Sequence, residues 1–139
     1  MFRGASLLAV ASARIPGGQG RAWFSVAVTD DELLAVVHEA VDAVVASFDG
    51  HDDWGLSGGR DGQYASDLVA DSAALPVLQD AGLAVLSEES GRSGDAELVA
   101  VVDPLDGSTN ASRPLPWFAT SICVVEGDRA RGGGGARSR

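Results

Sequence analysis

The chain contains no lysine, a single cysteine and only two histidines among its 139 residues. Its ten basic side chains are therefore all arginines, against 20 acidic ones, and the formal net charge is −10. The single cysteine, Cys123, excludes an internal disulfide, and a thiol within an apolar run is most simply a small buried hydrophobe. We therefore expect a protein of the reducing cytoplasm.

The excess of acidic residues argues against a nucleic-acid-binding protein, because such proteins present a basic face to the phosphate backbone. No apolar run approaches the ~20 residues of a membrane span, so we expect no membrane partner. The few histidines and the cysteine form no recognisable pair of nucleophile and base. The length suits one domain with a core rather than two.

Two short acidic motifs carry most of the information in the chain. Ser87-Glu88-Glu89-Ser90 follows the apolar run 83–86, and Asp103-Pro104-Leu105-Asp106-Gly107-Ser108-Thr109-Asn110 follows a strand expected over 97–102. Neighbouring strands that end in acids concentrate negative charge at one sheet edge, and such a cluster requires a cation. Carboxylate oxygens suit Mg²⁺, and the N–H groups of a following helix start suit an anion.

Together with the later stretch Leu115-Pro116-Trp117-Phe118, these motifs resemble the inositol monophosphatase family of Mg²⁺-dependent phosphatases. The resemblance runs from about residue 30 to residue 125 and implies an α/β fold, a layered α/β sandwich of which this chain is the first part. It also implies that metal-activated water attacks a phosphate monoester directly, without a covalent intermediate.

The resemblance implies a metal site built from four residues of this chain. The Glu88 carboxylate would bind a metal ion, and the Asp103 carboxylate would bridge two ions. The Leu105 backbone carbonyl would be a further ligand, and Asp106 would bind the second ion. Mg²⁺ is the cofactor that follows from this assignment.

The resemblance also implies a phosphate site and a set of catalytic residues. Backbone N–H groups of Gly107 and Ser108 would contact the phosphate, and the Ser108 hydroxyl would orient the attacking water. An upstream acid assists this water. Asp67 is the best match to that acid, and Asp71 is its rival. Asp67, Glu88 and Ser108 are thus the expected catalytic residues.

Hydrophobic periodicity predicts two helices before the first motif. Thr29-x-x-Glu32 is a capping box that opens a helix expected over 30–48. A second helix is expected over 66–79, with Leu68 and Leu78 facing the core and Pro76 as an irregularity near its end. Further elements are strands over 83–86, 97–102 and 117–125, a turn over 91–94 and a helical turn over 108–111.

Three parts of the chain are expected to differ in structure. Residues 1–28 have no family counterpart and should lie outside the fold, whereas 29–126 should form the N-terminal part of the inositol monophosphatase-like domain. The Gly- and Arg-rich residues 127–139 should be disordered. The family pattern continues with a further acidic motif that nothing here matches, so we expect a frameshift or premature stop, and little or no activity.

The predicted function is Mg²⁺-dependent hydrolysis of a phosphate monoester, with inositol monophosphate or a related polyol phosphate as substrate. Fructose 1,6-bisphosphate, histidinol phosphate and nucleotide 3′-phosphates are alternatives, because related phosphatases share the Asp-Pro-Leu-Asp-Gly core. A catalytically incompetent, truncated homologue is the competing hypothesis. The resemblance also suggests a homodimer. An acidic partner-binding module has no positive feature in its favour.

Overall fold

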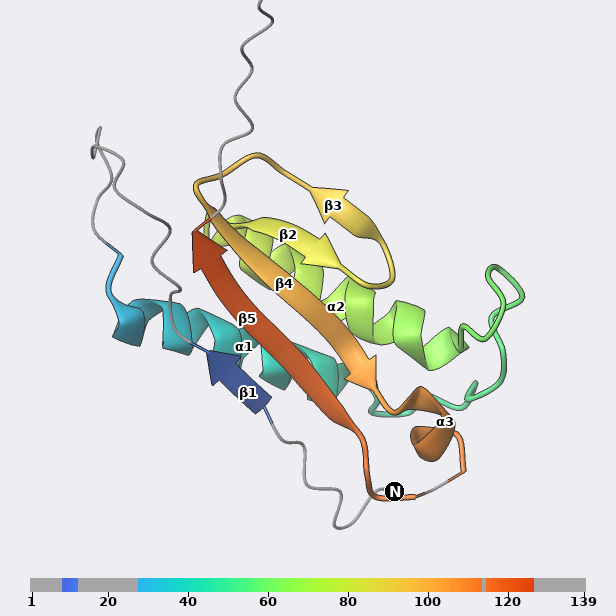
Figure 1. Ribbon diagram of the computed structural model, residues 1–139. Coiled ribbons are helices and arrows are strands. Elements are labelled where there is room, and N and C mark those ends of the chain that lie inside the picture. The colour runs from blue at the N-terminus through green and yellow to red at the C-terminus, as the bar shows by residue number, and fades with distance from the viewer. Residues whose placement is uncertain (1–8, 13–27, 114, 127–139) are drawn as a thin grey trace, which may run out of the picture.

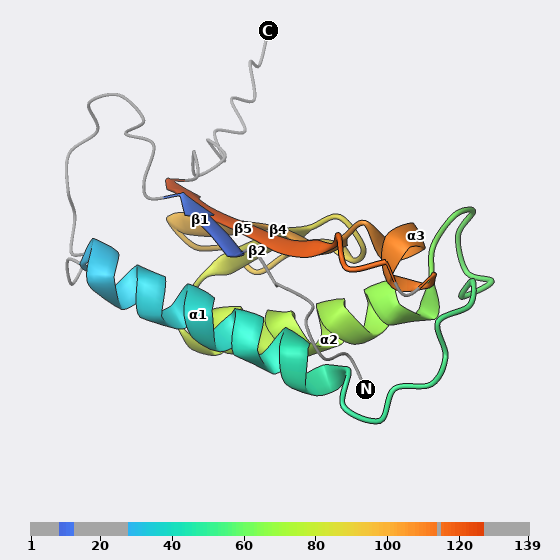
Figure 2. The same ribbon diagram turned by 90° about the horizontal axis from the view of Figure 1, so that it is seen from below.

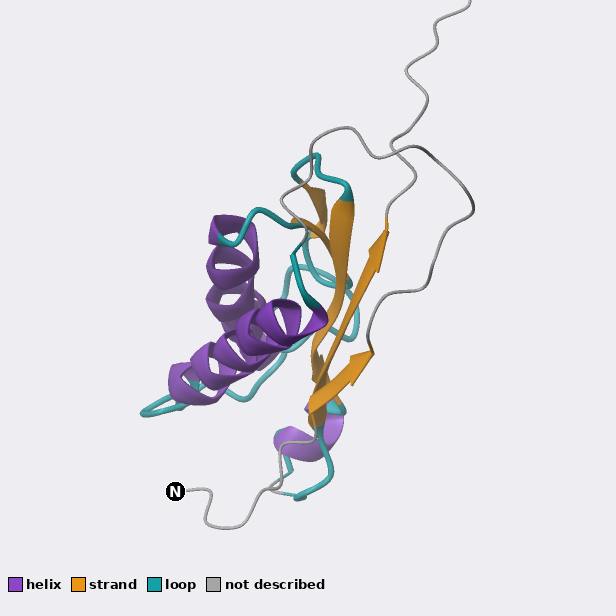
Figure 3. Ribbon diagram, turned by 90° about the vertical axis from the view of Figure 1, so that its left-hand side faces the viewer, coloured by secondary structure: helices purple, strands orange, loops and turns teal. Residues whose placement is uncertain are grey.

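The computed structural model describes residues 9–12, 28–113 and 115–126. Five strands form one sheet, and the two long helices cover one of its faces, as Figure 2 and Figure 3 show from two sides. The strands are β1 (Ala9–Ser12), β2 (Ala84–Ser87), β3 (Gly91–Ser93), β4 (Leu98–Asp106) and β5 (Ala119–Glu126). The helices are α1 (Asp30–Ser47), α2 (Ala65–Asp80) and α3 (Ser108–Ala111) (Figure 1).

Helix α1 begins at the predicted capping box. The backbone N–H of Thr29 donates to Glu32 Oε2 at 2.8 Å, and the N–H of Glu32 donates to Thr29 Oγ1 at 3.2 Å. Two of the N–H groups that a helix start leaves without partners are satisfied in this way. The predicted apolar face is buried, so the expectation for this helix is confirmed; its buried residues are Leu33, Val37, Ala40, Val41 and Val44.

Helix α2 differs from its prediction in one residue that matters. Leu78 is fully buried, as expected, but Leu68 is 41% exposed. The prediction for Leu68 was wrong because this residue lies outside the buried face of the helix, whose apolar members are Ala70, Ala74 and Leu78. Pro76 lies within the helix and does not shorten it.

The order of strands in the sheet is β1-β5-β4-β2-β3. Strand β4 pairs in parallel with β2 and antiparallel with β5. In the parallel pair Ser87 lies opposite Val102, so the residues that follow these two positions, Glu88 and Asp103, lie side by side at the same end of the sheet. The strand pairing thus places the two acidic motifs side by side.

Strand β4 is longer than predicted and includes the start of the second acidic motif. It extends through Asp106, with a shift of register against β5 between Asp103 and Asp106. Pro104 lies at this irregularity, where its missing N–H breaks no regular ladder bond. The Thr120 hydroxyl donates to the Pro104 carbonyl at 2.9 Å and ties the irregular segment to β5.

Two predictions of irregular structure were wrong. Residues 91–94 were expected to be a turn, but Gly91–Ser93 forms β3, which pairs antiparallel with β2. Residues 1–28 were expected to lie outside the fold, but Ala9–Ser12 forms β1 in parallel with β5. In both cases the edge of a strand offers unpaired N–H and C=O groups, which a short segment can satisfy whatever its own propensity. The predicted tail, residues 127–139, lies outside the described residues.

The face of the sheet opposite the helices carries an exposed apolar row. Leu86 and Val101 are 44% and 39% exposed, and the strand register places them opposite each other, with Cys123 next in the row. Cys123 was expected to be buried, but it is half-buried. No helix in the described part of the chain is long and apolar enough to cross a membrane.

The packing of α2 predicts that two leucines of this helix respond differently to truncation. Leu78→Ala should lower the free energy of unfolding by about 2–5 kcal/mol, because it opens a cavity in a closed core. Leu68→Ala, the matched control, should cost well below ~1 kcal/mol, since the side chain already contacts solvent. Urea unfolding followed by circular dichroism measures both, and equal losses would contradict the burial described here.

Candidate metal and phosphate site

A cavity of about 350 Å³ opens at the carboxyl ends of β2 and β4. It is lined by the loop that precedes α2, by the first acidic motif, and by the second acidic motif with the start of α3. Every residue that the sequence analysis assigned to the site lies in its lining; these residues are Asp67, Glu88, Asp103, Leu105, Asp106, Gly107 and Ser108. Segments distant in sequence therefore meet at one point.

Negative charge is concentrated where the two strands end. The pKa of Asp103 is raised to about 6, mainly by burial and then by the neighbouring Glu88 and Asp106 carboxylates. A hydrogen bond between the Asp103 and Glu88 side chains acts in the same direction, whereas the Leu105 N–H opposes it. Three acids this close repel one another, and a cation among them would relieve the repulsion.

The chemistry of the donor groups fits a hard divalent cation. The wall offers carboxylate oxygens from Glu88, Asp103 and Asp106, and the Leu105 residue also lines the cavity. Mg²⁺ prefers such oxygen ligands. The described residues contain no group of three or more acidic, histidine or cysteine side chains already gathered closely enough to hold one ion. The individual ligand roles therefore stay predictions.

Asp67 and its rival Asp71 occupy different environments. Asp67 is 4% exposed and lines the cavity; its Oδ2 accepts the Tyr64 N–H at 2.8 Å, while its buried Oδ1 has no partner. Burial is the main cause that raises the pKa of Asp67, and the Tyr64 N–H opposes it. Asp71 instead accepts a hydrogen bond from Ser87 beneath the first motif and is not part of the lining.

Gly107 turns the chain from β4 into α3. Its φ of 88° lies in the left-handed region, which residues with a side chain rarely adopt. A Cβ at this position would also lie 2.9 Å from the Trp117 carbonyl oxygen. Asn110 Nδ2 donates to the same oxygen at 2.8 Å, so the stretch around Trp117 is held against the turn. The Asn110 and Ala111 N–H groups donate to the Gly107 carbonyl, and the N–H groups that precede them at the helix start lie at the cavity.

The sequence analysis missed five residues that line the cavity. They are Arg60, Asp61, Gly62, Gln63 and Glu89. Arg60 and Gln63 lie in a Gly- and Asp-rich segment with the composition of a solvated loop, and nothing local indicates their contacts. Glu89 stands beside a predicted ligand, but adjacency alone does not show that both acids of the pair line the cavity.

An acid-lined cavity that faces a helix start at the ends of two parallel strands suits a protein that handles phosphate with a divalent cation. A model of the inositol monophosphatase family matches residues 26–133, which is most of the chain. The chain therefore belongs to this family. The match extends beyond both ends of the predicted range 29–126.

Curated relatives carry the same stretch. The fructose-1,6-bisphosphatase/inositol-1-monophosphatase of Archaeoglobus fulgidus is 39% identical over 75 residues, which cover 52% of this chain and 30% of that protein. The Nus factor SuhB of Escherichia coli is 35% identical over 94 residues, or 66% of this chain and 33% of that protein. This chain thus spans about a third of the length of the curated relatives it matches.

Solved structures agree with the fold. An inositol monophosphatase from Anabaena superposes with a TM-score of 0.55 and 27% identity, over 69% of this chain and 36% of that one. The extragenic suppressor protein suhB from Bartonella henselae gives a TM-score of 0.52 and 27% identity, over 68% and 40% of the two chains. The fold is therefore the α/β fold of inositol monophosphatases, and the chain is shorter than its relatives, as the sequence had indicated.

The geometry at Gly107 predicts a specific sensitivity to an added methyl group. Gly107→Ala should destabilise the protein by about 1–3 kcal/mol from its backbone conformation, with a further loss from the close contact to the Trp117 carbonyl. Gly50→Ala is the matched control, because Gly50 has a φ of 76° but open space where its Cβ would stand. Chemical denaturation of both variants measures the difference, and an equal loss would show that the close contact costs nothing.

Proposed function

We propose that this chain supplies the cation- and phosphate-binding part of a Mg²⁺-dependent phosphate monoesterase, with inositol monophosphate or a related polyol phosphate as substrate. The main support is that all seven residues assigned from the sequence line a single cavity. A chance distribution of strand-end acids would not bring Asp67, from the start of a helix, together with the two strand-end motifs.

Different residues of the chain would bind the cation and orient the attacking water. Glu88, Asp103, Asp106 and the Leu105 carbonyl would hold the cation, which supplies positive charge that polarises the phosphoryl group and lowers the pKa of water. The unpartnered Oδ1 of Asp67 would accept a hydrogen bond from the attacking water. The Ser108 hydroxyl would orient this water.

The phosphate would lie against the turn into α3. Backbone N–H groups of Gly107 and Ser108 would donate to its oxygens, and they cost no reorganisation because the turn is already formed. The tight approach of Trp117 to Gly107 would keep this turn from opening. Binding of the anion would thus depend on backbone geometry more than on side-chain charge.

Fructose 1,6-bisphosphate is the second candidate substrate, because the matched protein of Archaeoglobus fulgidus is named for both activities. A catalytically incompetent homologue is the second candidate function. We retain the reducing cytoplasm as the proposed compartment and a homodimer as the proposed assembly.

Cation binding tests the proposed site without requiring turnover. Saturating Mg²⁺, at about 100 times its dissociation constant, should raise the free energy of unfolding by about 2.7 kcal/mol. Asp106→Asn should weaken Mg²⁺ affinity at least about tenfold, because it removes a charged ligand. Asp80→Asn, an exposed acid at the end of α2, is the matched control and should leave the affinity unchanged. Calorimetric titration measures the affinities, and equal effects of both substitutions would refute the site.

Phosphate release tests the reaction and the substrate. We predict little or no turnover of inositol 1-phosphate or fructose 1,6-bisphosphate by this chain alone, since the family resemblance implies a further metal ligand in a motif that the chain lacks. Brisk Mg²⁺-dependent release would overturn this expectation and would identify the preferred substrate. Release that persists in Asp106→Asn would count against the assigned residues instead.

A further inference from the structure

The two adjacent acids at the end of β2 have different surroundings. The Glu89 side chain is only 8% exposed, and its Oε2 accepts hydrogen bonds from Arg60 Nη2 at 2.8 Å and from Gln63 Nε2 at 2.5 Å. Glu88 is exposed, lines the cavity and pairs with Asp103. The Glu89 carboxylate is thus already compensated by protein groups, whereas Glu88 interacts with another acid.

The backbone around these acids is held by contacts on several sides. The Glu88 N–H donates to the Val102 carbonyl at 2.9 Å, and Arg60 Nη1 donates to the Glu88 carbonyl at 3.2 Å. The Glu89 N–H donates to Ser87 Oγ at 3.1 Å, and that hydroxyl in turn donates to the buried Asp71. Both peptide groups of Glu88 are therefore fixed, and its side chain is directed by the strand and the turn.

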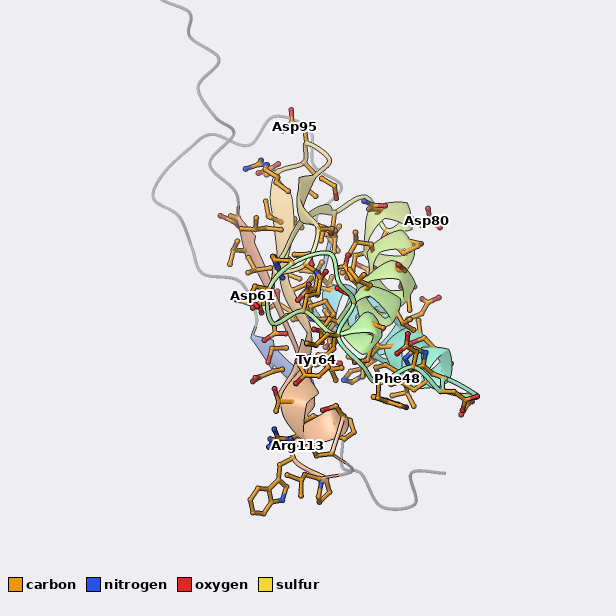
Figure 4. The ribbon with its side chains drawn as sticks, turned by 90° about the vertical axis from the view of Figure 1, so that its right-hand side faces the viewer. Phe48, Asp61, Tyr64, Asp80, Asp95 and Arg113 are labelled. Atoms are coloured by element: carbon orange, nitrogen blue, oxygen red, sulfur yellow. The ribbon has the colours of Figure 1, made fainter. Side chains whose placement is uncertain are left out.

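The loop that carries Arg60 has internal order of its own. Ser57 N–H donates to the Gln63 carbonyl at 2.8 Å, and Ala65 N–H donates to the Gly55 carbonyl at 2.9 Å. Ser57 Oγ also donates to Gln63 Oε1 at 2.9 Å, so the amide that contacts Glu89 is itself oriented. Figure 4 shows this loop passing in front of the strands at Asp61 and returning toward α3 at Tyr64. The loop is thus able to present Arg60 at a fixed place.

We propose that Arg60, Gln63 and Glu89 form a latch that holds Glu88 toward the cavity, and that Glu89 is a positioning residue rather than a cation ligand. The inference rests on the proposed function, because it concerns how the first acidic motif is arranged for a divalent cation. Arg60 contacts both residues of the pair, since its two terminal nitrogens donate to the Glu89 carboxylate and to the Glu88 backbone carbonyl. A bidentate guanidinium suits this task better than an ammonium group.

The latch and simple electrostatics predict opposite effects of removing Arg60. A cationic side chain beside a cation site repels the ion, so its loss alone would tighten cation binding. A positioning role predicts the reverse, because Glu88 would lose its fixed geometry and Glu89 would lose its partner. Residues that orient metal ligands typically change metal affinity by about 10–100-fold when they are replaced. The sign of the change therefore separates the two roles.

The experiment titrates the whole chain with Mn²⁺, followed by electron paramagnetic resonance, for wild type and three variants. Arg60→Ala should weaken Mn²⁺ binding about tenfold, and Arg60→Lys should restore part of it because one contact and the charge remain. Arg92→Ala is the matched control, since it removes the same charge from an exposed position on β3 outside the cavity. The free energy of unfolding of Arg60→Ala should change by no more than about 1 kcal/mol, because the arginine is half-exposed.

Hydrogen exchange of the segment 57–63 gives a second, metal-free measurement. Arg60→Ala should accelerate amide exchange in this segment and leave exchange in α1 unchanged, as expected when a latch opens locally. Unchanged or tighter Mn²⁺ binding in Arg60→Ala, with wild type binding normally, overturns the latch alone. Failure of wild type to bind Mn²⁺ overturns the proposed function and the positioning role with it. Unchanged exchange in the loop overturns the latch whether or not Mn²⁺ binds.

Discussion

The parallel pairing of β2 with β4 is the constraint on which the rest of the site depends. Because Ser87 lies opposite Val102, the next residues along the chain, Glu88 and Asp103, must lie side by side at the same end of the sheet. Burial and, after it, the neighbouring Glu88 and Asp106 carboxylates raise the pKa of Asp103, so the charged form of this acid is disfavoured here. A carboxylate cluster with this geometry is costly to the folded protein until a cation neutralises it, which links stability to ligand binding.

The remaining irregular features of the chain compensate for, or make use of, that cluster. Asp103 and Asp106 are three positions apart, so the regular alternation of a strand would direct their side chains to opposite faces. The register shift between them lets one strand present both acids to the cavity. The left-handed turn at Gly107 then changes direction at once, so the start of α3 faces the same cavity. Asp67 keeps a buried oxygen without a partner. Such unsatisfied groups and special conformations are features that functional sites tolerate and cores do not.

The sequence predicted what local patterns encode and missed what distant contacts decide. The capping box at Thr29 and the apolar spacing of α1 are local, and that helix forms as predicted. Strands β1 and β3 were missed because they are short and form by pairing with the exposed edge of another strand. The residues of these two strands give no local indication of that pairing. Leu68 was misassigned because periodicity gives the apolar face of a helix but not its width. The strand-end acids came from the two motifs and Asp67 from the family resemblance, whereas Arg60 and Gln63 depend on contacts across more than 25 residues of chain.

The unequal environments of Glu88 and Glu89 bear on how such acid pairs should be interpreted in general. Glu88 and Glu89 both line the cavity, but the Glu89 carboxylate accepts hydrogen bonds from Arg60 and Gln63. The Arg60 charge balances the Glu89 carboxylate and does not enter the cluster of Glu88, Asp103 and Asp106. The negative charge left in the cavity is therefore set by the loop as much as by the motifs. A loop without this arginine would leave a fourth acid uncompensated. The choice of metal ion would then depend on the total negative charge of the site rather than on its geometry.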